Sequence, residues 1–178
     1  RPARPHLADP GVGAALVAAL FICGRGRYPL AMTIGTPGVF GVTSDVARGV
    51  SRMWLDRGFS PLLEFTLPNG RRLDVAAISD AGEIAAVEIK VSLADFRADE
   101  KWPEYLEYCD RYYFAVPDGF PAEVLPSAFG LIVADRFGAA IVREAPHTPV
   151  AAARRKSLLI KFARTAAERF ARAGDPHR

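Results

Sequence analysis

The chain has 178 residues, of which half are hydrophobic and 24% are charged, a composition that favours one folded globular domain and excludes disordered and fibrous proteins. Its two cysteines, Cys23 and Cys109, lie too far apart for a zinc knuckle or a disulfide framework, so we expect a protein of the reducing cytoplasm. The net charge of +3 conceals an acidic middle, with 11 basic and 17 acidic side chains over residues 31–153, and a basic end over residues 154–178 that favours binding to polyanions.

Residues 1–42 show no clear secondary-structure pattern, and we expect them to form an N-terminal extension ahead of a single domain over residues 43–178. An apolar run over residues 12–23 is shorter than the ~20 residues that span a bilayer. Two arginines follow this run in place of a cleavage site, so a secretion signal is not favoured either. Because the chain opens on Arg1 and Met32 begins a more ordinary stretch, a disordered extension and a misassigned start are both open.

A helix and three strands are predicted for the first half of the domain. The helix has apolar residues at helical spacing, with Thr43 or Ser44 placed to cap its start and Gly58 placed to end it. In the three segments that follow, apolar residues alternate with other residues, as in strands of an antiparallel meander. These strands cover residues 62–67, 72–77 and 84–91.

The second half of the domain alternates between helices and strands. Ser92 with Asp95 three residues later is a capping signal for a helix that runs through residues 96–109. Pro103 lies inside this stretch, so the helix is either kinked or broken, with Pro103 opening a second piece. Three strands over residues 111–116, 129–133 and 139–142 and a basic helix over residues 152–173 complete the chain. This order predicts an α/β or α+β fold with a mixed sheet flanked by helices.

The two hairpin loops of the meander fix its register. Each loop, residues 68–70 and 80–82, has three residues and ends in glycine, which suits a type I turn followed by a left-handed residue. Counting back from these turns places Glu64 opposite Asp74, and Asp74 opposite Glu88, on one face of the sheet. The opposite face is then entirely apolar and consists of Leu63, Phe65, Leu67, Leu73, Val75, Ala77, Ala85, Val87, Ile89 and Val91.

The row of carboxylates predicts a bound cation, because like charges on neighbouring strands destabilise a sheet. Mg²⁺, with Mn²⁺ as a substitute, is held by one or two carboxylates and keeps coordination sites for water and phosphate. Lys90 lies two residues after Glu88 on the same face, where it can position or activate an attacking water. This chemistry is phosphodiester hydrolysis. The alternative is a solvated sheet face, since so short a motif often occurs by chance.

The spacing of Asp74 and the Glu88-Ile89-Lys90 tripeptide resembles the PD-(D/E)XK nuclease superfamily. More narrowly, the chain is similar to the MmcB family of bacterial DNA repair proteins, a likeness that covers about residues 43–172. The stretches that carry it are residues 69–75, 87–90, 95–99, 101–105, 109–117, 130–135, 143–146 and 153–156.

The resemblance implies a restriction-endonuclease-like core and a Mg²⁺-dependent DNA-cleaving site that acts in DNA repair. Asp74 and Glu88 would bind the metal together with the backbone carbonyl of Ile89, and Lys90 would act on the attacking water. The superfamily often supplies another acidic group from the helix before the meander. In this sequence that helix has acidic residues only near its ends, so Glu64 is the substitute that the register suggests.

Basic residues outside the acidic row are candidates for DNA binding. They are Lys101, which follows the predicted site, and Arg154, Arg155 and Lys156 at the start of the C-terminal helix. A solvated helix face explains the last three equally well. Trp102 could stack on a base, but packing in the core is the favoured interpretation.

Three functions remain open from the sequence. The first is a Mg²⁺-dependent deoxyribonuclease, and the second is a catalytically inactive nuclease fold that binds DNA as a repair accessory factor. The third is a structural or protein-binding module in which Glu88 and Lys90 are surface residues. The intact acidic row with its lysine favours the first, because a surface that only binds DNA would gain from losing those carboxylates. We expect DNA as the partner, no membrane association and a cytoplasmic location.

Overall fold

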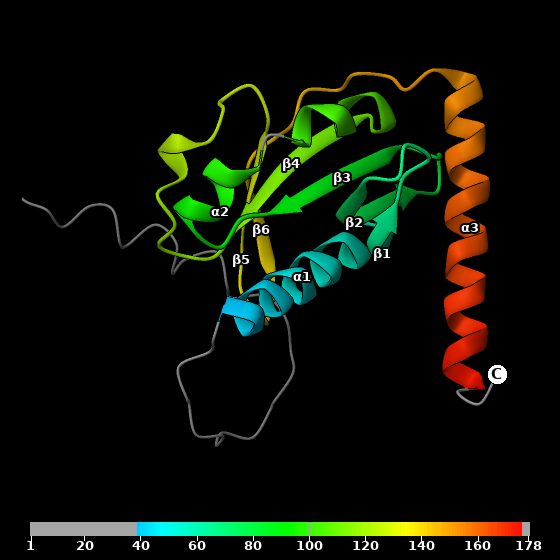
Figure 1. Ribbon diagram of the computed structural model, residues 1–178, viewed down its shortest axis with the longest axis horizontal. Coiled ribbons are helices and arrows are strands. Elements are labelled where there is room, and N and C mark those ends of the chain that lie inside the picture. Colours follow the sequence, from blue (N-terminus) through cyan, green and yellow to red (C-terminus); the bar gives the residue numbers. More distant parts are fainter. Residues whose placement is uncertain (1–38, 100, 176–178) are drawn as a thin grey trace, which may run out of the picture. The chain divides into compact units, whose positions relative to one another are not determined.

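One mixed sheet organises the domain (Figure 1). The computed structural model describes residues 39–99 and 101–175, so the expectation of an N-terminal extension lies almost wholly outside the described residues. The strands are hydrogen-bonded in sequence order and comprise β1 (Phe59–Thr66), β2 (Arg72–Ser79), β3 (Ile84–Ile89), β4 (Arg111–Val116), β5 (Gly130–Ala134) and β6 (Ala139–Arg143). The β3–β4 and β4–β5 pairs are parallel and the other pairs are antiparallel, which confirms the predicted fold class.

The first helix, α1 (Val39–Asp56), begins earlier than predicted. Thr43 and Ser44 lie inside it, and the Ser44 hydroxyl donates to the carbonyl of Gly41 at 3.0 Å, so neither residue is the cap. The sequence explains the difference, because no proline separates Val39 from Thr43 and helical periodicity can extend back to Val39. The other end agrees with the prediction, since Gly58 follows the helix with a left-handed φ of 77°.

Both hairpins of the meander have the predicted register. Gly70 and Gly82 have φ angles of 83° and 78°, as a three-residue loop requires. Leu63 pairs with Val75, and Val75 pairs with Val87, which is the alignment obtained by counting back from the turns.

The predicted apolar face divides between two cores. Helix α1 packs on one face of the sheet, above a row of buried residues that comprises Val75, Ala77, Ala85, Val87 and Ile89. Phe65, Leu67 and Leu73 instead belong to the core on the other side, and Leu63 is 40% exposed. In β1, Glu64 has a left-handed φ of 48° and interrupts the alternation of side chains before Phe65 and Leu67, and Leu73 of β2 is the strand partner of Phe65. The prediction of ten apolar residues on one face was therefore wrong for these four.

The second core is covered by the segments between β3 and β4 and by the C-terminal helix. Helix α2 (Leu93–Ala98) is capped by the Ser92 hydroxyl, which accepts from the backbone N–H of Asp95 at 3.1 Å, as predicted. The chain then breaks, and the 3-10 helix η1 (Trp102–Tyr108) has Pro103 in its first turn. A short 3-10 turn, η2 (Ala122–Val124), precedes β5, and α3 (Ala152–Gly174) closes the domain. Among the described helices, none is long and apolar enough to cross a membrane.

A candidate cation-binding cleft

A cleft of about 790 Å³ opens where β2 and β3 carry their acidic residues. It brings together all the predicted catalytic residues, because Asp74, Glu88, Ile89 and Lys90 all line it. The remaining lining residues come from α1, β1, the start of β2, the segment after β3, α2 and α3, and comprise Thr43, Ser44, Ala47, Leu63, Glu64, Arg72, Val91, Asp95 and Arg169.

Asp74 and Glu88 come from neighbouring antiparallel strands. The pairing of Val75 with Val87 places the residue before Val75 beside the residue after Val87. The Asp74 carboxylate accepts the backbone N–H of Ile89 through Oδ2 at 2.8 Å, which fixes its side chain across the strand pair. Glu88 is 7% exposed. The sheet therefore holds two carboxylates together at the edge of the core.

The Glu88 carboxylate is only partly satisfied by the protein. Its Oε1 atom accepts from Lys90 Nζ at 3.3 Å, whereas Oε2 is buried and has no hydrogen-bond partner among the described residues. Burial raises the pKa of Glu88 to about 8, with a further contribution from the charge of Asp74. Burial also raises the pKa of Asp74, although the N–H of Ile89 and the charge of Lys90 oppose this. Two neighbouring carboxylates, one buried and one half-buried, that resist ionisation match the electrostatic requirement of a bound divalent cation.

Lys90 is buried, with 3% of its surface exposed, and is held between two carboxylates. Its Nζ atom lies 2.6 Å from Asp99 Oδ2 and 3.3 Å from Glu88 Oε1. Burial alone would lower the pKa of Lys90, but the hydrogen bond to Asp99 and the charge of Glu88 raise it overall. Lys90 is therefore an ammonium group, a hydrogen-bond donor and a positive charge, in this arrangement.

Asp99 is a site residue that the sequence argument missed. It follows α2 directly as the C-cap, and its pKa is lowered because the hydrogen bonds from Lys90 and from the backbone of Lys101 outweigh burial. No local signal pointed to it, because the predicted helix ran through residues 96–109 and placed Asp99 inside a helix, whereas α2 ends at Ala98.

Glu64 lines the cleft from β1, where the backbone register leaves it across from Asp74. Its side chain is exposed, and its carboxylate lies 3.6 Å from Arg72 Nη1. Arg169 of α3 donates to the backbone carbonyls of Leu63 and Glu64, at 2.8 Å for the latter. Within residues 39–99 and 101–175, no three Asp, Glu, His or Cys side chains converge on one point as a complete metal site. The protein thus offers the pair Asp74 and Glu88, which is the number of carboxylates typical of a Mg²⁺ site.

The predicted DNA-binding residues differ in their surroundings. Lys101 and Lys156 are exposed. Arg154 pairs with Glu107 at 2.8 Å, and its guanidinium lies over the Tyr108 ring. Trp102 packs in the core, as favoured, with its ring 4.9 Å from that of Phe129.

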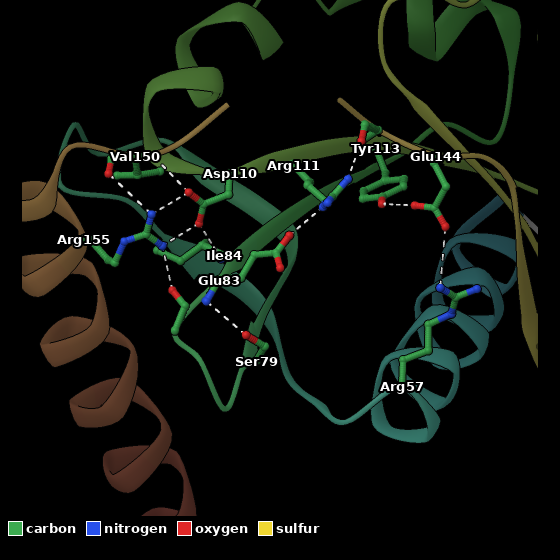
Figure 2. Close-up of polar contacts among 12 residues, drawn as sticks. Arg57, Ser79, Glu83, Ile84, Asp110, Arg111, Tyr113, Glu144, Val150 and Arg155 are labelled. Carbon is green, nitrogen blue, oxygen red and sulfur yellow. Dashed lines mark hydrogen bonds and ion pairs between the residues drawn. The ribbon is translucent and has the colours of Figure 1, made fainter. Parts of the chain in front are cut away.

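Arg155 is committed to the interior, as Figure 2 shows. Its guanidinium donates to both oxygens of Asp110 at 2.6 Å and to the carbonyl of Gly82 at 2.7 Å. Sequence reasoning gave Asp110 no role, because a contact across 45 positions leaves no local pattern.

Comparison with known proteins gives one family and one related structure. The model of a family described as DNA repair protein MmcB-like matches residues 41–177. A solved structure of a protein of unknown function from Silicibacter pomeroyi is 48% identical, with a TM-score of 0.74, and the alignment covers 75% of this chain and 92% of that one. No curated protein matches the chain.

Proposed function

The chain belongs to the MmcB-like family of DNA repair proteins, and from this premise we propose that its cleft is the active site of a divalent-cation-dependent deoxyribonuclease. The observation that carries the proposal is the pair of half-buried Asp74 and buried Glu88, with Oε2 of Glu88 unpartnered among the described residues and the ammonium of Lys90 beside it. The same arrangement supports a nuclease core of the PD-(D/E)XK type.

The residues of the cleft fit Mg²⁺ or Mn²⁺. Asp74 and Glu88 would hold the ion together with the backbone carbonyl of Ile89, and water and phosphate oxygens would complete its coordination. When bound, such an ion polarises the phosphoryl group and lowers the pKa of a coordinated water. It would also compensate the repulsion between the two carboxylates, which the protein alone leaves in place.

Lys90 would act as a hydrogen-bond donor in this site. Because its ammonium is held by two carboxylates, it is suited to orient the attacking water and to stabilise negative charge on the phosphate, rather than to accept a proton. Burial of its side chain strengthens these interactions, since water screens them little.

Positive groups at the rim of the cleft would guide the DNA backbone. Arg72 and Arg169 line the cleft, and Lys101 is exposed two residues after Asp99. Lys156 is exposed beside Arg155, at the Asp110 end of the sheet, so it could contact only a more distant part of the DNA. Contacts between such residues and phosphates make binding dependent on salt concentration. Arg155 is excluded from this surface because its donors are bound to Asp110 and Gly82. Arg154 would contribute only by leaving Glu107.

A second candidate is a DNA-binding repair factor with an inactive nuclease fold. The observation that favours it is the position of Glu64, which pairs with Arg72, so that no third carboxylate completes the acidic pair within the described part of the chain. This candidate retains DNA binding and loses hydrolysis.

The proposal is tested by incubating the protein with flapped, nicked and crosslinked DNA in Mg²⁺ or Mn²⁺. We expect metal-dependent cleavage that falls by about 100-fold or more in the Asp74→Ala and Lys90→Ala variants. Asp118→Asn removes an exposed carboxylate in the loop after β4 and should leave cleavage unchanged. Cleavage that survives both cleft substitutions would contradict the assignment, and salt-dependent binding without cleavage would favour the accessory factor.

A further inference from the structure

We propose that Asp99 is a positioning residue that keeps the contact between the Lys90 ammonium and Glu88 longer and weaker than a full ion pair, and thereby leaves the Glu88 carboxylate open to a divalent cation. This inference rests on the proposed function, because it concerns the same cleft. Asp99 caps α2, which lies outside the strands that carry Asp74 and Glu88. In this proposal it influences whether Lys90 or a metal ion binds the Glu88 carboxylate.

The distances show which carboxylate holds Lys90 more tightly. The Nζ atom lies 2.6 Å from Asp99 Oδ2, a short charge-assisted hydrogen bond, and 3.3 Å from Glu88 Oε1. An ammonium group has three donors and rotates freely at the end of its chain. Without Asp99, nothing in these contacts would keep Lys90 from forming its full ion pair with Glu88.

Asp99 is itself fixed from two sides. Its Oδ1 atom accepts the backbone N–H of Lys101 at 2.9 Å, and its own N–H donates to the carbonyl of Phe96 at 3.3 Å. The Phe96 ring packs edge-on against Phe114 of β4, with centroids 5.8 Å apart. Each carboxylate oxygen thus has its own donor, and rotation of the side chain would break both hydrogen bonds.

The consequence for Glu88 follows from its unequal oxygens. Oε1 bears the longer contact to Lys90, and Oε2 is buried without a partner among the described residues. A lysine released from Asp99 would approach Glu88, neutralise it and compete with any cation for it. Asp99 therefore keeps Glu88 available to a metal ion without having to bind the metal itself.

The test is a double-mutant cycle on Mn²⁺ affinity, measured by calorimetric titration of the full chain. We expect Asp99→Asn to weaken binding by about 10-fold or more, as substitutions around metal ligands do. In a Lys90→Met background the same substitution should change the affinity by less than about twofold, because the competing ammonium is gone. Equal losses in the two backgrounds would overturn the inference and would reduce Asp99 to a nearby negative charge.

Asp95→Asn is the matched control for charge. Asp95 lines the cleft and accepts the backbone N–H of Val91 at 3.2 Å, so its removal subtracts the same charge without releasing Lys90 from Asp99. We expect a smaller loss of Mn²⁺ affinity, equal with and without Lys90. The inference would also be overturned if Asp95→Asn weakened Mn²⁺ binding as much as Asp99→Asn does and if that loss likewise disappeared in the Lys90→Met background.

A second readout does not need metal. The hydrogen-bonded, buried ammonium of Lys90 should give a slowly exchanging ¹H–¹⁵N signal in NMR spectra of the wild-type protein. This signal should be lost in Asp99→Asn, kept in Asp95→Asn and partly restored in Asp99→Glu; its persistence in Asp99→Asn would refute the role of Asp99. A wild-type protein that binds no Mn²⁺ would instead overturn the proposed metal site, and this NMR comparison would still decide what holds Lys90.

Discussion

Asp110 and Glu88 are both buried carboxylates, and they lie at opposite ends of the parallel β3–β4 pair. Asp110 precedes β4 and binds the start of β3, where the N–H of Ile84 donates to it at 2.8 Å. Glu88 lies near the carboxyl end of β3 and faces the cleft. The domain surrounds these two acids in contrasting ways, and the contrast separates a structural carboxylate from the one for which we propose a functional role.

Every oxygen of Asp110 is satisfied by the protein. Besides Ile84, the N–H of Val150 donates to it at 2.9 Å, and Arg155 binds both oxygens (Figure 2). These hydrogen bonds outweigh burial and lower the pKa of Asp110. The acid ties β3, the segment before α3 and α3 itself together, and it leaves no acceptor for a ligand.

Glu88 shows the opposite balance. One oxygen has no partner among the described residues, the neighbouring charged acid repels it, and its pKa is raised to about 8. Ionisation of Glu88 therefore destabilises the folded protein unless a cation is present. The comparison supports a structural role for Asp110 and agrees with our proposal that Glu88 binds a cation.

The largest expected effect is on the structural side. Arg155→Met leaves Asp110 buried and unpaired, and we expect the free energy of unfolding to fall by about 3–5 kcal/mol. Urea denaturation measures this. The neighbouring Arg154→Met, which removes an exposed pair with Glu107, should cost about 1 kcal/mol or less. Equal losses of unfolding free energy in the two variants would show that the buried ion pair of Asp110 is worth no more than an exposed one.

The pH dependence of stability distinguishes the two acids next. The folded pKa of Glu88, about 8, lies above its ordinary value of 4.5, so its contribution is fully present below pH 4.5 and is lost as the pH rises towards 8. In metal-free buffer the wild type should lose up to about 1.4 kcal/mol per pH unit in this window relative to Glu88→Gln. Urea denaturation at pH 5, 6, 7 and 8 measures the difference. Parallel curves for the two proteins would show that Glu88 carries no such penalty.

Cation binding should stabilise the functional end of the strand pair. At a free Mn²⁺ concentration of about 100 times the dissociation constant, we expect the free energy of unfolding to rise by about 2.7 kcal/mol. Asp74→Asn should abolish this gain, as monitored by thermal unfolding with and without Mn²⁺. The Arg154→Met variant should retain it, and an undiminished gain in Asp74→Asn would place the ion elsewhere.

The smallest effect is expected at the rim of the cleft. Glu64 is exposed and paired with Arg72, so Glu64→Gln should change Mn²⁺ affinity by less than about threefold, consistent with the small worth of exposed pairs. Calorimetric titration beside Asp74→Asn measures this. A loss as large as that of Asp74→Asn would make Glu64 a metal ligand, as the register first suggested.

Local patterns in the sequence were sufficient to predict the centre of the fold. Two loops ending in Gly70 and Gly82 set the strand register, and that register brought Asp74 beside Glu88. Both features depend on turn residues and on the alternation of side chains, which can be recognised in short stretches of sequence. The broken helix at Pro103 was predictable for the same reason.

Features that depend on contacts between distant segments were not predictable. Glu64 has a left-handed backbone and an exposed side chain that pairs with Arg72, and a non-glycine residue gives no sequence signal of such a conformation. Arg155 was a candidate for DNA binding because an arginine in a basic helix gives the same sequence pattern whether it faces solvent or forms a buried ion pair. Asp99 required knowledge of how α2 folds back over Lys90.

The central claim is that Glu88 and Asp74 form a cation site, and a crystal soaked in Mn²⁺ tests it most directly. Anomalous scattering identifies manganese without reference to activity. The account predicts a peak between the Asp74 and Glu88 carboxylates, within coordination distance of Glu88 Oε2. A well-ordered cleft without a peak, or manganese bound only elsewhere on the chain, would contradict it.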